Sequence, residues 1–319
     1  MKNSKKFLLK FSSAIFILFF ASFIGCKNSP TDSVVNTEPT TDKAALEKIT
    51  LEDSALSSFE LNYNEEGMMD MMSPMGMGKT TSEIFPVKVG RKITSVTRTF
   101  TITQLSDTTA EGNLVLVFTG NLLIGVTKDP SIKSIDTVIS KPFVTTVERN
   151  VKFVKVANTN HPLQNWRISA SSLTKGGTNS ANIFIKSITV KLPSGDEILI
   201  TDPLNYYLSH GLGRMKQIPI VSQNQDVTVE VEIHSAYASE DFVSLTYGAG
   251  FHNKMNRAKR KFVLLSDDGL GNKVYSQTYR ANSFMGYFHA VIDAMPTQVI
   301  KDDTAPVESS DWGFPYIVK

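Results

Sequence analysis

Cysteine is nearly absent from this sequence: among 319 residues it occurs once, as Cys26. A single cysteine excludes an internal disulfide framework and any metal site built from several cysteines. The five histidines form neither an HxH nor an HExxH pattern, and no G-x-S-x-G occurs, so zinc hydrolases and α/β-hydrolases have no support. No spacing singles out a carboxylate pair for glycoside hydrolysis. We therefore expect a protein that is not an enzyme and has no cofactor.

A large excess of charge is also missing. The chain has 33 basic and 31 acidic side chains, but four of the lysines lie within its first ten residues. Without residues 1–25, 29 basic and 31 acidic side chains remain, a net charge of −2. This balance predicts no general attraction to nucleic acid. The composition, 41% hydrophobic and 20% charged, is typical of a chain with buried cores, and the length allows about two domains.

The N-terminus carries the clearest signal. Basic residues precede an apolar run from Phe11 to Ile24, which is typical of a secretory signal peptide and is short for a membrane span. The run ends in Phe23-Ile24-Gly25-Cys26, which resembles the lipobox of bacterial lipoproteins. The resemblance implies that residues 1–25 are removed and that Cys26 becomes a lipidated, palmitate-bearing N-terminus. Two or three acyl chains would anchor it stably in a membrane. In bacterial lipoproteins, Asp directly after the lipidated cysteine favours retention in the inner membrane. The resemblance therefore implies that Lys27, at this position, favours the outer membrane.

Residues 26–41 are rich in Asn, Ser, Thr and Pro, which predicts a flexible tether. Asp42 is the expected cap of a helix that follows. The spacing of the apolar residues predicts one amphipathic helical face formed by Leu46, Ile49, Leu56 and Phe59. We expect this helix to begin a first domain over 42–202.

The rest of that domain has the texture of antiparallel sheet, with short Val-, Ile- and Thr-rich segments between turn residues. The expected strands are 92–104, 112–126, 134–140, 143–156, 164–172, 181–192 and 196–201. The last two form a hairpin through Pro193-Ser194-Gly195. One helix before long strands predicts a helix on a curved sheet, as in cystatin-like or NTF2-like folds. A second sandwich with the helix outside it is the alternative.

Residues 203–225 read as a linker, and a second β set follows over 226–319. The expected strands are 226–234, 241–248, 257–265, 273–280, 284–293 and 313–318. In the first of them Val227, Val229, Val231 and Ile233 alternate with polar residues, which predicts one buried and one exposed face. Regular turns predict a β-sandwich that folds by itself. The segments 287–294 and 312–318 resemble the late strands of bacterial immunoglobulin-like surface domains, although the cysteine pair of true immunoglobulin domains is missing.

The most unusual segment is rich in methionine. Its six thioethers are soft ligands that suit Cu(I) or Ag(I): Met68, Met69, Met71, Met72, Met75 and Met77. We expect this segment to be a loop whose methionines fill a gap in the packing or bind a partner. We predict no tight metal site in it.

Five basic residues also cluster within a short segment: Lys254, Arg257, Lys259, Arg260 and Lys261. Such a group can bind phosphates, anionic sugars or lipid headgroups. We expect these basic residues to form a solvent-exposed face that protects an edge strand from aggregation. The aromatic residues Trp166, Tyr206, Tyr207 and Trp312 could stack on sugars, but in a sandwich they are expected in the core.

The sequence thus predicts a mostly β, two-domain, non-catalytic protein held on the bacterial envelope by a lipid anchor. An envelope protein or a glycan is the expected partner. A soft-metal-binding lipoprotein and a small-ligand pocket in the first domain are the alternatives.

Overall fold

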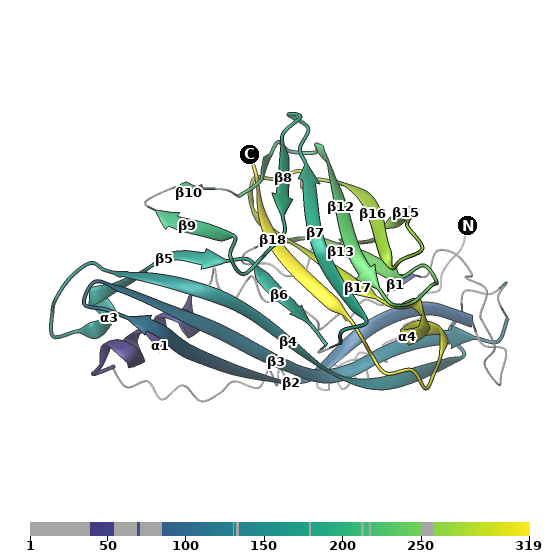
Figure 1. Cartoon of the computed structure of the whole chain (residues 1–319), viewed down its shortest axis with the longest axis horizontal. Coiled ribbons are helices and arrows are strands. Elements are labelled where there is room, and N and C mark those ends of the chain that lie inside the picture. The colour runs from purple at the N-terminus through teal and green to yellow at the C-terminus, as the bar shows by residue number, and fades with distance from the viewer. Residues whose placement is uncertain are drawn as a thin grey trace, which may run out of the picture. The chain divides into compact units, whose positions relative to one another are not determined.

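The computed structural model describes residues 39–53, 69–70, 85–129, 131, 134–178, 180–211, 214–216, 218–250 and 258–319. In this part of the chain the protein is mostly β, with two sheets whose strands are antiparallel except for one short parallel pair. The predicted fold class is confirmed at this level. Figure 1 shows the order of the elements.

Three long neighbouring strands form one part of the larger sheet: β2 (Phe85–Leu105), β3 (Thr109–Thr127) and β4 (Thr137–Lys155). The two-residue strand β1 (Met69–Asp70) pairs with β2. On β3 buried apolar residues alternate with less buried ones, because successive side chains of a strand point to opposite faces. One face of these strands is therefore covered along most of its length.

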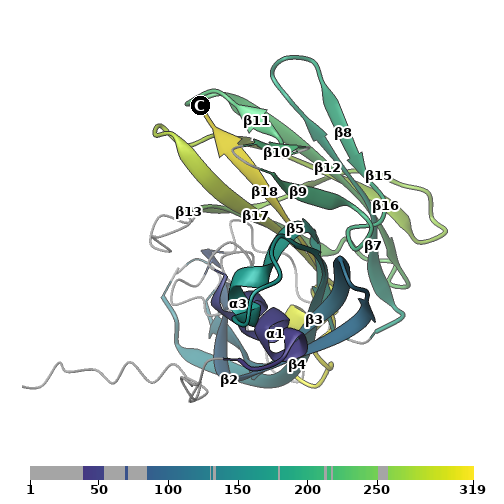
Figure 2. The ribbon, with the colours of Figure 1, turned by 90° about the vertical axis from the view of Figure 1, so that its left-hand side faces the viewer.

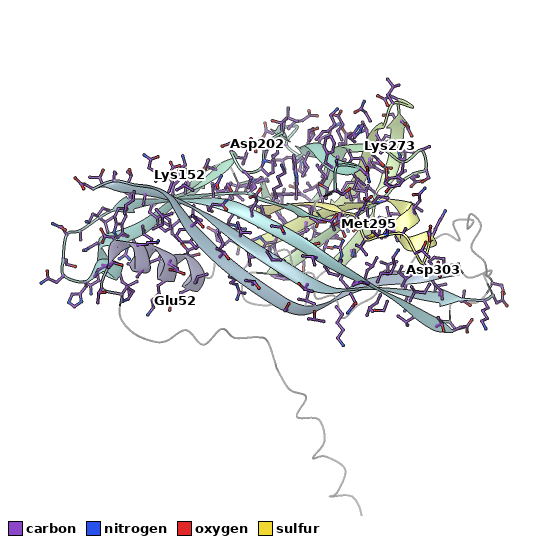
Figure 3. The ribbon with its side chains drawn as sticks, turned by 60° about the horizontal axis from the view of Figure 1, so that its bottom comes forward. Glu52, Lys152, Asp202, Lys273, Met295 and Asp303 are labelled. Carbon is purple, nitrogen blue, oxygen red and sulfur yellow. The ribbon has the colours of Figure 1, made fainter. Side chains whose placement is uncertain are left out.

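Different elements cover the two ends of that face. At one end lie α1 (Asp42–Glu52), α3 (Pro162–Asn165) and β5 (Trp166–Ser172) (Figure 2). Leu46 of α1 packs there with Phe153 and Trp166. At the other end α4 (Thr297–Lys301) lies over β2 and packs against Leu122, Ile124 and Phe143. Figure 3 shows both ends, marked by Glu52 of α1 and by Met295 and Asp303 beside α4.

The helix α1 agrees with the sequence in part. Leu46 is buried and Ile49 packs against the same cluster, as predicted, whereas Leu56 and Phe59 lie outside the described residues. The cap differs from the expected one: Thr41 accepts the hydrogen bond from the Ala44 amide at 3.2 Å. Asp42 instead begins the helix and pairs with Lys155, at 3.2 Å.

A second, five-stranded sheet has the order β15-β16-β12-β7-β8. Its strands are β7 (Ile183–Lys191), β8 (Glu197–Ile200), β12 (Asp226–Ser235), β15 (Val263–Asp267) and β16 (Asn272–Arg280). On β12 the four apolar side chains Val227, Val229, Val231 and Ile233 are buried, which confirms the predicted alternation. The hairpin between β7 and β8 is also confirmed.

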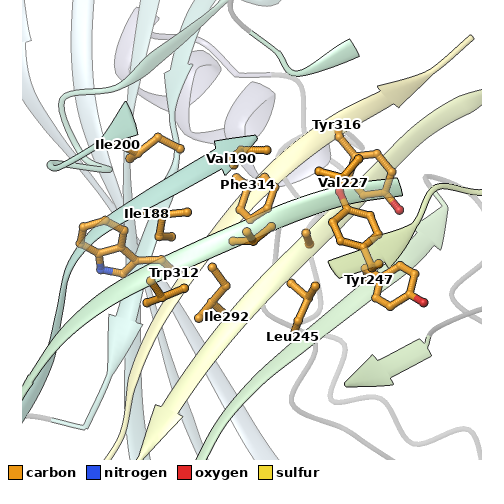
Figure 4. Close-up of a cluster of buried hydrophobic side chains, with 14 of the residues drawn as sticks. Ile188, Val190, Ile200, Val227, Leu245, Tyr247, Ile292, Trp312, Phe314 and Tyr316 are labelled. Carbon is orange, nitrogen blue, oxygen red and sulfur yellow. The ribbon is translucent and has the colours of Figure 1, made fainter. Parts of the chain in front are cut away.

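The larger sheet continues beyond β4 through β6 (Thr174–Gly177) to β18 (Ser310–Val318), β17 (Gly286–Met295), β13 (Phe242–Gly250) and β14 (Ala258–Lys261). These strands pack against the five-stranded sheet. The shared core contains Ile188 and Val190 from one sheet and Ile292, Phe314 and Tyr316 from the other (Figure 4).

The predicted domain boundaries need correction. The strands β7 and β8 precede residue 203, yet β7 pairs with β12 along nearly its whole length. The expected linker, 203–225, contains three short strands: β9 (Tyr207–Gly211), β10 (Arg214–Lys216) and β11 (Ile220–Val221). Of these, β9 pairs with β5, and β11 pairs with β18 in parallel. Residues 226–319 therefore lack strands that their sheets need, and the described residues from 39 to 319 form one compact unit.

Candidate functional site

The two faces of β17 have different chemistry. Phe288, Ala290 and Ile292 point into the apolar core between the sheets. His289 and Asp293, at the intervening positions, lie on the opposite face and are also buried. Because ionisable side chains are rarely buried without partners, this second face is the candidate site.

Asp293 is held by an arginine from the long strands. Arg91 of β2 donates two hydrogen bonds to the carboxylate, from Nη1 to Oδ2 at 2.7 Å and from Nη2 to Oδ1 at 3.1 Å. This two-pronged geometry is the strongest form of the ion pair. The pair connects β2 to β17, which are far apart in the sequence and do not pair as strands.

A second carboxyl group lies beside the first. Asp311 of β18 is opposite Asp293 in the strand register, and it is fully buried. Burial by itself raises the pKa of Asp293. The charge of Arg91, a hydrogen bond with Asp311 and the charge of Lys259 outweigh that effect and hold the pKa of Asp293 below its ordinary value.

Arg149 of β4 and His289 complete the group. Burial, together with the positive charge of Arg149, lowers the pKa of His289 to about 3, so the imidazole is neutral near pH 7. We refer to Arg91, Arg149, His289, Asp293 and Asp311 as the buried charge cluster. Its members come from β2, β4, β17 and β18, so it spans the space between the long strands and the sandwich.

This arrangement is suited to fastening strands together. The pKa of Asp293 is lowered by the guanidinium beside it, so this carboxylate is a weak base. The imidazole of His289, with a pKa of about 3, is a weak base too. Breaking a buried pair leaves an uncompensated charge, so the pair resists separation of its two elements. The Arg91–Asp293 pair thus fixes β2 against β17.

A buried lysine provides a second fastening. Lys141 of β4 donates to the carbonyl oxygens of Val299, at 2.7 Å, and Asp302, at 2.8 Å. These carbonyls lie at the C-terminal end of α4, where a positive charge is favourable. Burial lowers the pKa of Lys141, and the nearby Asp302 and Asp303 oppose that shift. Lys141 therefore ties α4 to the long strands.

The residues named by the sequence lie elsewhere. Outside the described residues are Cys26, Met68, Met71, Met72, Met75, Met77, Lys254 and Arg257, and nothing is described of the side chain of Met69 on β1. Lys259, Arg260 and Lys261 form most of β14, an edge strand, where Lys261 pairs with Glu240 at 3.0 Å. Their position agrees with the edge-protecting interpretation.

The four aromatic residues considered for sugar stacking do not form one exposed surface. Trp166 and Trp312 are buried in separate cores, which agrees with the expectation that they are core residues. Tyr206 packs at the edge of the sandwich core, and the ammonium of Lys152 lies 4.3 Å from the ring centre of Tyr207.

The buried charge cluster was not predicted from the sequence, although the sequence carries a signal for one of its members. Arg149 stands between Val147 and Val151 at the spacing of one strand face, and both valines are buried. A charge at an inward position of an alternating strand points to a buried partner. The partner itself could not be named from spacing, because it lies on a distant strand.

Comparison with known proteins gives no assignment: no family model matches the chain, and neither does any curated protein. Among the described residues, no helix is long and apolar enough to cross a membrane. Within the same part of the chain, no group of three or more His, Cys, Asp or Glu side chains is placed to hold a metal ion.

Proposed function

We propose that this protein is a lipid-anchored binding module of the bacterial cell envelope, without catalytic activity, and that it binds another envelope protein. The anchor is proposed from the sequence, where the only cysteine follows a basic and then an apolar segment. The binding role is proposed from one structural observation, an exposed apolar patch at one end of the sandwich.

The patch is defined by Ile220 and Tyr287, both exposed, on either side of Ile317. Phe284 and Met285, of which Met285 is exposed to 71%, lie in the segment that leads into β17. Ile220 and Tyr287 flank Ile317 in the register of β11, β18 and β17, so the three side chains share one face. Aromatic residues and methionine are enriched where proteins bind each other, and exposed apolar patches often mark such sites. These features favour a protein partner over a glycan.

We further propose that the sandwich is immunoglobulin-like. The orders β15-β16-β12-β7 and β14-β13-β17-β18 agree with the D-E-B-A and C′-C-F-G sheets of that fold. The parallel pairing of β11 with β18 extends the second sheet. For the preceding part, the contacts of α1 with β2 and β5 support a helix on a curved sheet, the arrangement of cystatin-like or NTF2-like folds.

Two experiments test the function. Cys26→Ser should move the protein from the membrane pellet to the soluble fraction, and a variant that stays in the pellet at unchanged mass contradicts the anchor. A photo-crosslinking residue at position 285 in living cells should give one discrete adduct with another envelope protein. Position 199, equally apolar and exposed to 61%, is the matched control. Equal adducts at both positions, or none at 285, contradict the patch.

A further inference from the structure

A lysine and an aspartate are buried together between the two sheets of the sandwich. Lys273 lies on β16 of the five-stranded sheet, and Asp241 directly precedes β13 of the larger sheet. The side chains are 1% and 0% exposed, and Nζ of Lys273 lies 2.9 Å from Oδ2 of Asp241. This contact therefore connects the two sheets in a chain that has one cysteine and so no internal disulfide.

The nitrogen of Lys273 has three oxygen partners. Besides the carboxylate of Asp241, they are the backbone carbonyl oxygens of Tyr237, at 2.7 Å, and of Ser239. An ammonium group has three N–H donors, so transfer of one proton to the carboxylate leaves a neutral amine with two. The two carbonyl oxygens accept these two N–H groups, and the lone pair of the amine then faces the carboxyl group. The contacts thus orient Lys273 as a nucleophile toward Asp241.

The surroundings of the carboxyl group favour its neutral form and its reaction. Burial raises the pKa of Asp241, although hydrogen bonds from Lys273, Ser235 and Tyr275 oppose this shift. A neutral acid beside a neutral amine costs less to bury than two charges. Ser235 donates from Oγ to Oδ1 of Asp241 at 2.9 Å. This donor lies where negative charge develops when an amine adds to the carboxyl carbon, so it stabilises that addition.

We propose that Lys273 and Asp241 condense into an amide bond that links the two sheets covalently. Nζ of Lys273 forms a bond to Cγ of Asp241, and the bond from Cγ to Oδ2 breaks. One proton moves from the nitrogen to Oδ2 before the attack and a second moves after it, so Oδ2 leaves as water. The nitrogen keeps one N–H, and no oxidant, reductant or cofactor is needed. Because Oδ2 is bonded to Cγ, a small shift of Nζ brings the reacting atoms to the separation of about 3–3.5 Å that such attack requires.

Another lysine of the sandwich shows that burial, not distance, distinguishes this pair. Lys191 contacts Glu230 at 2.7 Å, but these side chains are 37% and 29% exposed. Water solvates both charges there, so the nitrogen remains an ammonium group, which has no lone pair for attack. A lysine becomes a nucleophile when it is desolvated, as Lys273 is. We therefore expect a bond between Lys273 and Asp241 and none between Lys191 and Glu230.

The first test is mass spectrometry of the full chain after it is unfolded and digested with trypsin. Asp241 lies in the fragment 217–254, and Lys273 lies within 262–280 as the one internal cleavage site. Trypsin does not cut after an acylated lysine. We therefore expect 217–254 joined to an uncut 262–280, at the sum of their masses less one water molecule. Recovery of 217–254 by itself, with 262–280 cut after Lys273, overturns the proposal and leaves only an ion pair.

The second test assigns the bond to its two residues. Lys273→Arg keeps the positive charge, but a guanidinium is not deprotonated in proteins, so this variant should release fragment 217–254 unlinked. A link that persists in the variant overturns the assignment. In the parent digest, Lys191 and Glu230 should remain unlinked, and linkage there to the same extent as at Lys273 overturns the role given to burial.

The proposed bond acts on the chain as a disulfide would. It closes the chain between Asp241 and Lys273 into a covalent loop, which lowers the conformational entropy of the unfolded state. The linked fragment is formed or not irrespective of the lipid anchor and of the apolar patch. Failure of this proposal is therefore distinguishable from failure of the proposed function.

Discussion

The two faces of β17 are a natural comparison within this molecule. On one face Phe288, Ala290 and Ile292 enter a core of apolar side chains from two sheets. On the other face His289 and Asp293 meet Arg91, Arg149 and Asp311. Both faces are buried, so exclusion from water alone does not distinguish them.

The difference lies in what each face specifies. Apolar packing is non-directional and roughly proportional to buried area, so it drives assembly of the sandwich. A two-pronged ion pair such as Arg91–Asp293 has a narrow geometry, and it contributes less net stability than its short distances suggest. We infer that the polar face fixes how the long strands sit on β17, whereas the apolar face provides most of the stability.

The largest effect is expected from breaking the ion pair on one side only. Arg91→Met should lower the free energy of unfolding by about 3–5 kcal/mol, because Asp293 would then be buried without its counter-charge. The measurement is urea denaturation followed by circular dichroism.

Its control removes both partners. The double variant Arg91→Met with Asp293→Leu should be clearly more stable than Arg91→Met alone, because neither partner of the pair is then left buried without its counter-charge. If the double variant is the less stable of the two, the polar face contributes stability rather than geometry, and the comparison is wrong.

On the apolar face, Ile292→Ala should lower the free energy of unfolding by about 2–5 kcal/mol, through lost burial and the cavity left behind. Shortening its neighbour Leu245 to Ala as well should not restore stability, in contrast to the double variant of the ion pair. The two substitutions either add their losses of unfolding free energy or enlarge one shared cavity. Rescue in that double variant would contradict the assignment of this face to the core.

Acid should weaken the polar face. The pKa of His289 is about 3 in the folded protein and near 6.5 when unfolded, so between these values the unfolded chain binds one more proton. Stability therefore falls as the pH falls through this window, by up to about 1.4 kcal/mol per pH unit. His289→Gln should flatten the slope between pH 4.5 and 6.5 in urea titrations, and an unchanged slope would show that His289 is not responsible.

The smallest effect is expected from a cross-strand ion pair on the exposed face of the sandwich. Lys186 contacts Glu232 there, and both side chains are more than a third exposed. Lys186→Met should lower the free energy of unfolding by no more than about 1 kcal/mol. Added salt should make this difference between parent and variant smaller still, because it screens the ion pair in the parent. A loss as large as that of Arg91→Met would mean that exposure does not separate the two pairs.

Local patterns explain what the sequence could predict. The alternation on β12 fixed which side chains would be buried, since strand geometry relates each residue to its immediate neighbours. Leu46 and Ile49 were placed correctly because helix geometry puts residues three or four apart on one face. Pairing between distant segments left no such trace: nothing near residues 183–191 indicates that β7 lies beside β12. The partner of Arg91 could not be named from the sequence, because Asp293 lies on a distant strand.

The order of the strands has a consequence for the speed of folding. The pairs β2–β3 and β3–β4 join neighbouring segments, and such contacts form quickly. The strand β6, by contrast, pairs Gly177 with Ser310, so it waits for a segment made much later. As the chain is synthesised, the long strands can assemble first, before β17 brings Val291 against the cluster that contains Leu114 and Leu116. This interval is when the chain is most prone to aggregate.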